Sequence, residues 1–266
     1  MTLLDKAAAA LGIAWSPEDA DRSTRATASP ERLRSLSSRL RDTPPTGEDP
    51  QEDTVPGTND RSSLQGDRQM LWVDGVGGFL LCTADEVVLG QPVSPNDAKH
   101  TAPTIGILGD LSRRHASIAR SGGGYIVTPI GPTELDGKPI DSPAALGDRA
   151  LLTLGGSVQV RFCRPHALSA TARLEIESHH RTAPSSDAVL LMAESCVLGP
   201  KPHSHVRCPA WEGEAILFRG AGGLLCRSES EMQVEGRSEA GPVAIRDGVR
   251  IEGQDFALSV EHVAEA

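Results

Sequence analysis

The sequence predicts an all-β protein, with two β-sandwich domains in tandem behind an N-terminal tail. Three observations lead to this fold class. From residue 69 onward, short apolar runs alternate with turn residues; the same region contains an internal repeat; and residues 42–68 carry almost no large apolar side chain. Apolar runs of strand length, separated by Gly, Pro, Asp and Ser about every eight to twelve residues, are typical of sandwiches.

The tail is predicted over residues 1–68, as short helices followed by a disordered linker. An Ala-rich stretch at 2–13 is the first helix candidate, and a second begins at Ser29, which is followed by a proline and an acid suited to a first helical turn. Pro, Gly, Thr, Asp and Glu dominate residues 42–68. Such a segment cannot bury enough apolar surface to offset its ordering entropy.

The rest of the chain contains two copies of one pattern. Val87–Gly90 recurs as Cys196–Gly199, and the turn sequence at 136–138 recurs at 235–237. Matched turns and apolar strands at near-constant spacing indicate the same fold twice, despite low identity. We predict two domains, over residues 69–164 and 171–263, with the loops after Gly90 and Gly199 at equivalent ends.

Charge and composition exclude several classes of partner. The formal net charge is -10 and aromatic residues make up 3% of the chain, so the sequence lacks both the basic field and the stacking rings of nucleic-acid binders. No apolar stretch approaches the ~20 residues of a membrane helix, and Asp5 and Lys6 interrupt the N-terminus, which makes it a poor signal peptide. We expect a cytoplasmic protein with no nucleic-acid or membrane partner.

The cysteines predict a reducing compartment. They number five, an odd count, and fall mostly inside apolar runs, which suits buried thiols better than a disulfide framework. They are Cys82, Cys163, Cys196, Cys208 and Cys226.

The most informative segment is the run Gly109-Asp110-Leu111-Ser112-Arg113-Arg114-His115. Together with Val88-Leu89-Gly90 upstream, and with Thr133–Lys138 and Leu154-Gly155 downstream, it resembles the forkhead-associated (FHA) family. The resemblance covers most of residues 69–164. It implies a sandwich that binds phosphothreonine peptides through loops at one end, without catalysis or a cofactor. A phosphothreonine brings nearly two negative charges and three strong acceptor oxygens, which hydroxyl, Arg and Lys donors satisfy.

The resemblance also assigns site residues by position. In the family, an Arg after the early Leu-Gly and the Ser of the motif meet the phosphate, an Asn before Gly-Thr holds the peptide backbone, and the motif His is structural. This chain departs twice, because Gln91 replaces the Arg and Gly131 stands where the Asn would be. Lys99 lies on a long insert that could reach the site. The expected phosphopeptide-binding residues are Ser112, Arg113, Arg114, Thr133, Gln91 and Lys99.

The second copy has lost the motif. Ser112 aligns with Trp211, Arg113 with Glu212 and His115 with Glu214, so a phosphate there would meet an acidic surface. We predict a degenerate domain, in which Trp211 is either an exposed anchor for a partner or is packed against the sandwich.

Metal and enzyme chemistry are weak alternatives. Cys196, His203, His205 and Cys208 are ligand types that zinc accepts, but their spacing is not that of a zinc knuckle. The sequence has no nucleophile elbow, phosphate loop or zinc-protease motif. We therefore predict no metal site, no catalytic residues and no enzyme activity.

Two functions follow from these observations. The first is an interaction adaptor in Ser/Thr phosphosignalling, with a phosphorylated protein or a Ser/Thr kinase as partner, and with its own tail, through Thr46 and Thr54, as a second candidate ligand. The other is a phospho-independent assembly module built from two degenerate FHA-type sandwiches. Ser112 with its two following arginines favours the adaptor, whereas Gln91 and Gly131 favour the module.

Overall fold

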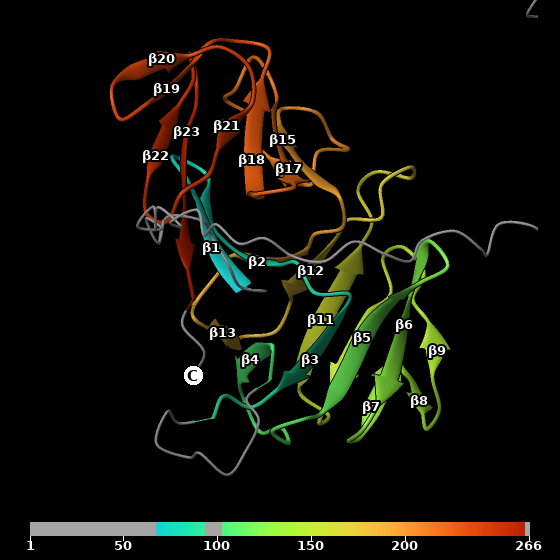
Figure 1. The fold of residues 1–266 in the computed structure, drawn as a ribbon. Helices are drawn as coiled ribbons and strands as arrows, with labels where there is room; N and C mark the ends of the chain where they lie inside the picture. The colour runs from blue at the N-terminus through green and yellow to red at the C-terminus, as the bar shows by residue number, and fades with distance from the viewer. Residues whose placement is uncertain (1–67, 94–102, 264–266) are drawn as a thin grey trace, which may run out of the picture. The chain divides into compact units, whose positions relative to one another are not determined.

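The computed structural model describes residues 68–93 and 103–263 of the 266-residue chain (Figure 1). These residues contain strands β1 to β23, and none of them is helical. The described part thus has no helix long and apolar enough to cross a membrane. The predicted tail, with Thr46 and Thr54, and the insert residue Lys99 lie outside the described residues.

The first repeat supplies eleven of the described strands. These are β1 (Arg68–Val73), β2 (Gly77–Cys82), β3 (Glu86–Gly90), β4 (Ile105–Leu108), β5 (Ala116–Ser121), β6 (Gly124–Pro129), β7 (Thr133–Leu135), β8 (Lys138–Ile140), β9 (Ala144–Ala145), β10 (Leu151–Leu154) and β11 (Val158–Cys163).

The second repeat supplies the other twelve described strands. These are β12 (Ala172–Ile176), β13 (Arg181–Ala183), β14 (Ala188–Leu191), β15 (Ser195–Gly199), β16 (Val206–Arg207), β17 (Ala215–Gly220), β18 (Gly223–Ser228), β19 (Met232–Val234), β20 (Arg237–Glu239), β21 (Val243–Ala244), β22 (Arg250–Glu252) and β23 (Ala257–His262).

The strands recur at the spacing seen in the sequence. Strands β5 to β9 correspond to β17 to β21 without a gap, from Ala116 and Ala215 onward. The turns recur as well, because Asp136 and Glu235 have φ values of 51° and 52°, and each is followed by a glycine with positive φ. The two copies therefore share their backbone conformation as well as their apolar pattern.

Within the described residues the strands form three sheets. The largest has twelve strands in the order β20-β19-β22-β23-β1-β2-β14-β12-β11-β10-β7-β8. A six-stranded sheet has the order β13-β4-β3-β5-β6-β9, and a five-stranded sheet the order β16-β15-β17-β18-β21. The all-β class predicted from the sequence is confirmed.

The two repeats exchange their first strands in the large sheet. Strand β1 pairs with β23, the last strand of the other repeat, with Leu71 opposite Val260. Strand β12 pairs with β11, with Leu174 opposite Phe162. Figure 1 shows cyan β1 beside red β23. The short connection from β11 to β12 favours their antiparallel pairing, and β1 is then left to complete the other half of the sheet. The boundaries 69–164 and 171–263 therefore mark copies in the sequence, while each packed sandwich contains strands from both.

Strands β2 and β14 join the two halves of the sheet. They pair in parallel, from Phe79 opposite Ala188 to Cys82 opposite Leu191, so equivalent positions of the repeats lie side by side. This register fits a local two-fold axis that runs parallel to β2 and β14, between them. Rotation about this axis relates the two repeats and places their covering sheets on opposite faces of the large sheet.

Two cores result, one on each face of the large sheet. Leu80 of β2 and Val189 of β14 belong to the first core, which the six-stranded sheet covers. Leu81 and Leu190, their neighbours along the chain, belong to the second core, which the five-stranded sheet covers. Because successive side chains of a strand point to opposite faces, β2 and β14 are buried on both sides. Their continuous apolar sequences have this origin.

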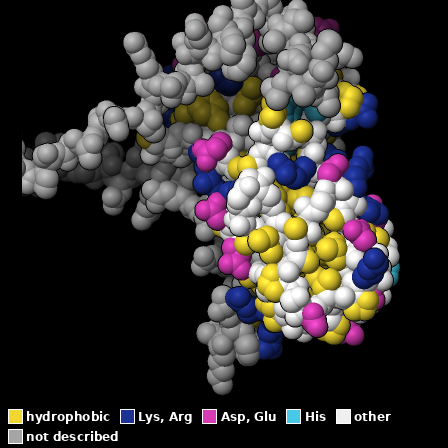
Figure 2. Space-filling model, turned by 90° about the vertical axis from the view of Figure 1, so that its right-hand side faces the viewer, with side chains coloured by type: hydrophobic (Ala, Val, Ile, Leu, Met, Phe, Trp, Pro, Cys, Tyr) yellow, Lys and Arg dark blue, Asp and Glu magenta, His cyan; other side chains and the backbone are white. Residues whose placement is uncertain are grey.

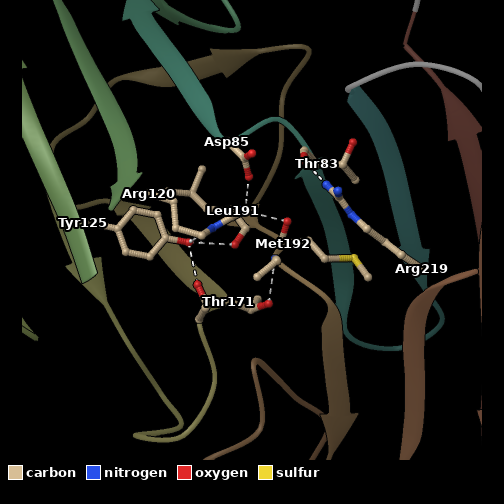
Figure 3. A network of polar contacts seen from close by, with 10 residues as sticks. Thr83, Asp85, Arg120, Tyr125, Thr171, Leu191, Met192 and Arg219 are labelled. Atoms are coloured by element: carbon tan, nitrogen blue, oxygen red, sulfur yellow. Dashed lines mark hydrogen bonds and ion pairs between the residues drawn. The ribbon is translucent and has the colours of Figure 1, made fainter. Parts of the chain in front are cut away.

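Two equivalent arginines bind the chain where it crosses between the sandwiches (Figure 3). The Nη2 of Arg120, in the first repeat, donates to the carbonyl of Met192 in the second at 3.0 Å. The Nη2 of Arg219, in the second repeat, donates to the carbonyl of Thr83 in the first. Each repeat therefore holds the crossing segment of the other through the same contact.

The crossing in the first sandwich has further bonds. The hydroxyl of Tyr125 lies 2.6 Å from the carbonyl oxygen of Ala170 and 3.2 Å from that of Leu191. Burial raises the pKa of Tyr125, so the phenol stays protonated and can donate. Thr171 donates from Oγ1 to the carbonyl of Ser195 at 2.6 Å.

All five cysteines are free and buried, as predicted for buried thiols. Burial raises the pKa of Cys196, Cys208 and Cys226 to about 12, so these groups are neutral thiols at pH 7.

Candidate functional site

Three loops meet around His115 at one end of the first sandwich. The imidazole is buried, its Nδ1 lies 3.2 Å from the amide of Ser112, and its Nε2 lies 2.8 Å from the carbonyl oxygen of Pro132. The amide of Gly155 lies 3.1 Å from the same Nε2 and donates to the Pro132 carbonyl at 3.0 Å. These contacts fit the tautomer in which Nδ1 accepts and Nε2–H donates. The structural role expected for His115 is confirmed.

The structure brings Gln91 and Ser112 together. The amide of Gln91 donates to the carbonyl of Ser112 at 3.0 Å, and the amide of His115 donates to that of Leu89 at 2.8 Å. Gly90 is required between them, because a Cβ there would overlap the carbonyl of Arg113. The loop that carries the motif is therefore tied to the end of β3, with the side chains of Gln91 and Ser112 exposed.

The cations of the motif reach the surface. Arg113 and Arg114 are exposed beside Ser112, and Arg114 forms no ion pair with a described residue. Asp110, in the same loop, is also exposed and reduces the net positive charge of the loop. On the side of the molecule shown in Figure 2, Lys and Arg are interspersed with Asp and Glu, without a field of one sign.

Thr133, which was predicted to face the peptide, does not face the surface. Thr133 is buried, and its Oγ1 donates to the carbonyl of Gly131 at 3.0 Å. Its hydroxyl therefore closes the loop from inside. A Cβ on Gly131 would lie 2.7 Å from Cε1 of His115, so the Asn of the family pattern does not fit here unless the imidazole moves. Lys99 lies outside the described residues.

The equivalent end of the second sandwich is closed by a carboxylate. The amides of Glu212 and Gly213 both donate to Oδ2 of Asp255. Trp211 is buried and packs on Phe256, with ring centroids 5.0 Å apart. Of the two alternatives for Trp211, packing against the sandwich is the one observed.

The charges at this second end are unsuited to a phosphate. Glu214, the counterpart of His115, pairs with Lys201 at 3.1 Å, and Glu212 is exposed. A phosphate would lose its water here and meet like charge.

His205, one of the residues considered for zinc, has other partners at both ring nitrogens. His205 accepts from the amide of Val197 at Nδ1, at 2.9 Å, and its Nε2 lies 3.0 Å from the Ser169 hydroxyl. Burial lowers the pKa of His205 to about 4, so the ring is neutral at pH 7. Among the described residues, no group of three or more metal-ligating side chains has the arrangement of a metal site.

The sequence did not predict that a segment of the second repeat lies near the site. Strand β13, from the second repeat, pairs with β4 of the first and places Arg181 opposite Leu108, one residue before the motif loop. The available signal was length, because residues 177–187 separate β12 from β14, whereas residues 74–76 separate β1 from β2.

No family model and no curated protein matches this sequence. Seven solved chains match it, and three of them are described as FHA domains. The second FHA domain of a Mycobacterium tuberculosis ABC transporter is 18% identical, over 57% of this chain and 99% of that one, with a TM-score of 0.24. A domain from work on phosphothreonine-dependent FHA interactions is 21% identical, over 34% and 88%, with a TM-score of 0.22. The N-terminal FHA domain of EssC, from the bacterial type VII secretion apparatus, is 11% identical, over 74% and 95%, with a TM-score of 0.19. The solved structures thus bear the name of the family that the Ser112–His115 motif resembles.

Proposed function

We propose that this protein is a non-enzymatic interaction adaptor in Ser/Thr phosphosignalling, and that the loops around Ser112 bind phosphothreonine peptides. The observation that carries the proposal is the loop cluster itself. His115 holds three loops from inside through neutral hydrogen bonds, which leaves the Ser112 hydroxyl and two guanidinium groups exposed at its surface. A phosphate dianion needs donors of this kind on a rigid support.

Binding at this site is expected to be weak. Gln91, adjacent to Ser112, is uncharged, and a charge-assisted bond to phosphate contributes ~1.5–3 kcal/mol. Affinity is therefore about tenfold to a hundredfold lower than with an arginine at that position. Thr133 adds no donor at the surface, since its hydroxyl bonds to Gly131.

The partner is a phosphorylated protein or a Ser/Thr kinase. The protein's own tail is a second candidate, through phosphorylated Thr46 or Thr54, because a flexible tether presents its ligand at an effective concentration near millimolar. A Thr46→Ala, Thr54→Ala double variant separates the two cases. Phosphorylation of the full chain should shift the amides around Ser112 in the wild type and leave them unchanged in the double variant.

A phospho-independent assembly module is the alternative, and the strand exchange favours it. The exchange makes one unit of the two repeats, in which the second repeat presents acidic loops to any partner. An assembly module of this kind needs no phosphate on its partner. The two functions therefore differ in whether binding depends on phosphorylation, which can be measured.

The test is calorimetry of the full chain against a panel of matched phosphothreonine and threonine peptides. We expect micromolar or weaker binding of phosphorylated peptides alone. Ser112→Ala should reduce it at least fivefold, whereas Ser121→Ala, an exposed serine at the other end of β5, should not change it. Equal binding of both peptide forms would favour the assembly module and exclude the adaptor.

A further inference from the structure

The second repeat reaches the edge of the first sandwich through an arm, residues 178–181. The arm lies in the long connection between β12 and β14, which has no counterpart in the short turn between β1 and β2. It ends where β13 begins, and β13 pairs antiparallel with β4, with Arg181 opposite Leu108. Figure 1 shows β13 beside β4.

The arm touches the loop that carries the candidate site. Strand β4 ends at Leu108, and the following residues form the loop that contains Ser112. A Cβ on Gly109 would lie 2.9 Å from Cδ2 of His180, so the imidazole rests directly on the backbone of this loop. The exchange thus brings a histidine and an arginine of the second repeat to the start of the loop that carries the candidate site.

His180 is held with one ring nitrogen available as a donor. The hydroxyl of Ser178 accepts from the amide of Gln159 at 3.1 Å and lies 2.8 Å from Nδ1 of His180. In the tautomer in which the Ser178 hydroxyl donates to Nδ1, Nε2 carries the ring hydrogen and can donate. Burial and the neighbouring ring of His179, 4.1 Å away, lower the pKa of His180 and favour this neutral form. No described residue accepts from Nε2–H.

Arg181, the next residue in the chain, adds a full positive charge to the arm. Its side chain is exposed and forms no ion pair with a described residue. Covering the edge of β4 accounts for the backbone of β13, since an unpaired edge invites aggregation. Backbone pairing does not depend on the side chains, however, so it gives no reason for a cation and a free ring donor at this point.

We propose that the arm forms one wall of the phosphopeptide site, where Arg181 and the Nε2–H of His180 bind an acidic side chain next to the phosphothreonine. This inference rests on the proposed function and makes it more specific. The ligand is a phosphothreonine peptide with Asp or Glu close to the phosphate. Because the arm belongs to the second repeat, that repeat contributes to the binding site although its own loops cannot bind phosphate.

The test is a cycle of two peptides and three forms of the full chain. The probes are two phosphothreonine peptides that carry either Glu or Gln at the positions within three residues of the phosphate. The proteins are the wild type, Arg181→Gln, and the control Arg237→Gln, which removes the same charge from an exposed position on β20. We expect the wild type and the control to prefer the Glu peptide roughly tenfold, in keeping with one charge-assisted contact. In Arg181→Gln this preference should fall to about twofold.

The outcomes separate this inference from the proposed function. If the phosphorylated peptides bind and Arg181→Gln retains the full Glu preference, the arm is not part of the site, while the phosphothreonine function stands. If the wild type binds neither peptide and ignores phosphorylation, both proposals are wrong. His180→Gln provides a second variant, because Nε2 of the glutamine can still donate where an alanine cannot. Loss of the Glu preference in His180→Ala and its partial return in His180→Gln is the expected pattern.

Discussion

The two ends that carry the motif positions are equivalent in the repeat and differ in their chemistry. In the first sandwich a neutral imidazole, His115, joins three loops and leaves Ser112 and two arginines at the surface. In the second, the carboxylate of Asp255 joins the loops and Trp211 fills the space below them. The comparison shows that the group that closes the loops and the exposed side chains beside it together give each end its charge. A neutral group is compatible with an anionic ligand, whereas a carboxylate with two further glutamates is not.

Replacing His115 and its counterpart Glu214 should have unequal effects. His115→Ala leaves the Ser112 amide and the Pro132 carbonyl without partners in a buried space, so we expect a loss of about 3–4 kcal/mol in the free energy of unfolding. Glu214→Ala, at the equivalent position, removes a half-exposed ion pair with Lys201 and should cost less than about 1 kcal/mol. Urea unfolding of both variants measures the difference. Similar losses would contradict the assigned role of His115.

Acid should destabilise the second half through His205. Its folded pKa of about 4 lies below the ordinary value of 6.5, so the unfolded chain binds the proton more readily. Stability is therefore complete above pH 6.5 and falls as the pH drops toward 4, by an amount on the order of 3 kcal/mol. Thr104 occupies the equivalent place in the first half. Its Oγ1 accepts from the amide of Val88, as Nδ1 of His205 accepts from the amide of Val197, and a threonine does not titrate.

The check is unfolding free energy against pH for the wild type and His205→Gln. The variant should lose most of the acid dependence between pH 6.5 and 4. An unchanged pH profile would mean that His205 does not cause the acid dependence.

The two crossing arginines should also differ. Arg120 is largely buried and binds Asp85, Tyr125 and the Met192 carbonyl, whereas Arg219 is exposed and binds the Thr83 carbonyl. Arg120→Met should lower the free energy of unfolding by about 2 kcal/mol, and Arg219→Met by less than about 1. Thermal unfolding of both variants gives the ranking. If Arg219→Met is the more damaging, the crossings are not stabilised as described.

Position 91 gives the smallest expected effect and the most specific one. Gln91→Arg places a cation beside Ser112 and should raise affinity for a phosphothreonine peptide about tenfold, close to 1.4 kcal/mol. Gly131→Asn restores the other family residue but collides with His115, so it should lower stability without improving binding. Calorimetry and a melting curve on each variant separate these results. Tighter binding by Gly131→Asn would show that the loop is more adaptable than this packing allows.

Much of the fold was predictable because its determinants are local. The turns at Asp136 and Glu235, and the apolar strands around them, lie at matched spacing in the sequence. Ser112 and Gln91 could be placed together because both lie next to motif residues. The strand exchange could not be predicted, since β1 and β12 have similar apolar patterns and either partner would bury them. The uninterrupted apolar runs Phe79–Cys82 and Ala188–Leu191 are local signs that both faces of these strands are covered.

The roles of the inward-facing side chains could not be predicted from the sequence either. A threonine hydroxyl in a loop can form a hydrogen bond either to a bound peptide or to the backbone of its own loop. For Thr133, the bond to the Gly131 carbonyl shows that the second case holds. His180 and Arg181 were not assigned to the site because they are about 70 residues away in the sequence, and pairing between β13 and β4 depends on the exchange.

The central claim is that the first loop cluster binds phosphothreonine and the second does not. The most direct measurement is amide chemical-shift mapping of the full chain, titrated with a phosphothreonine peptide and with its unphosphorylated form. We predict phosphate-dependent shifts at Gln91 and at Ser112–Arg114, and none at Trp211–Glu214. Shifts centred on Trp211–Glu214, or the same shifts with both peptides, would contradict the account.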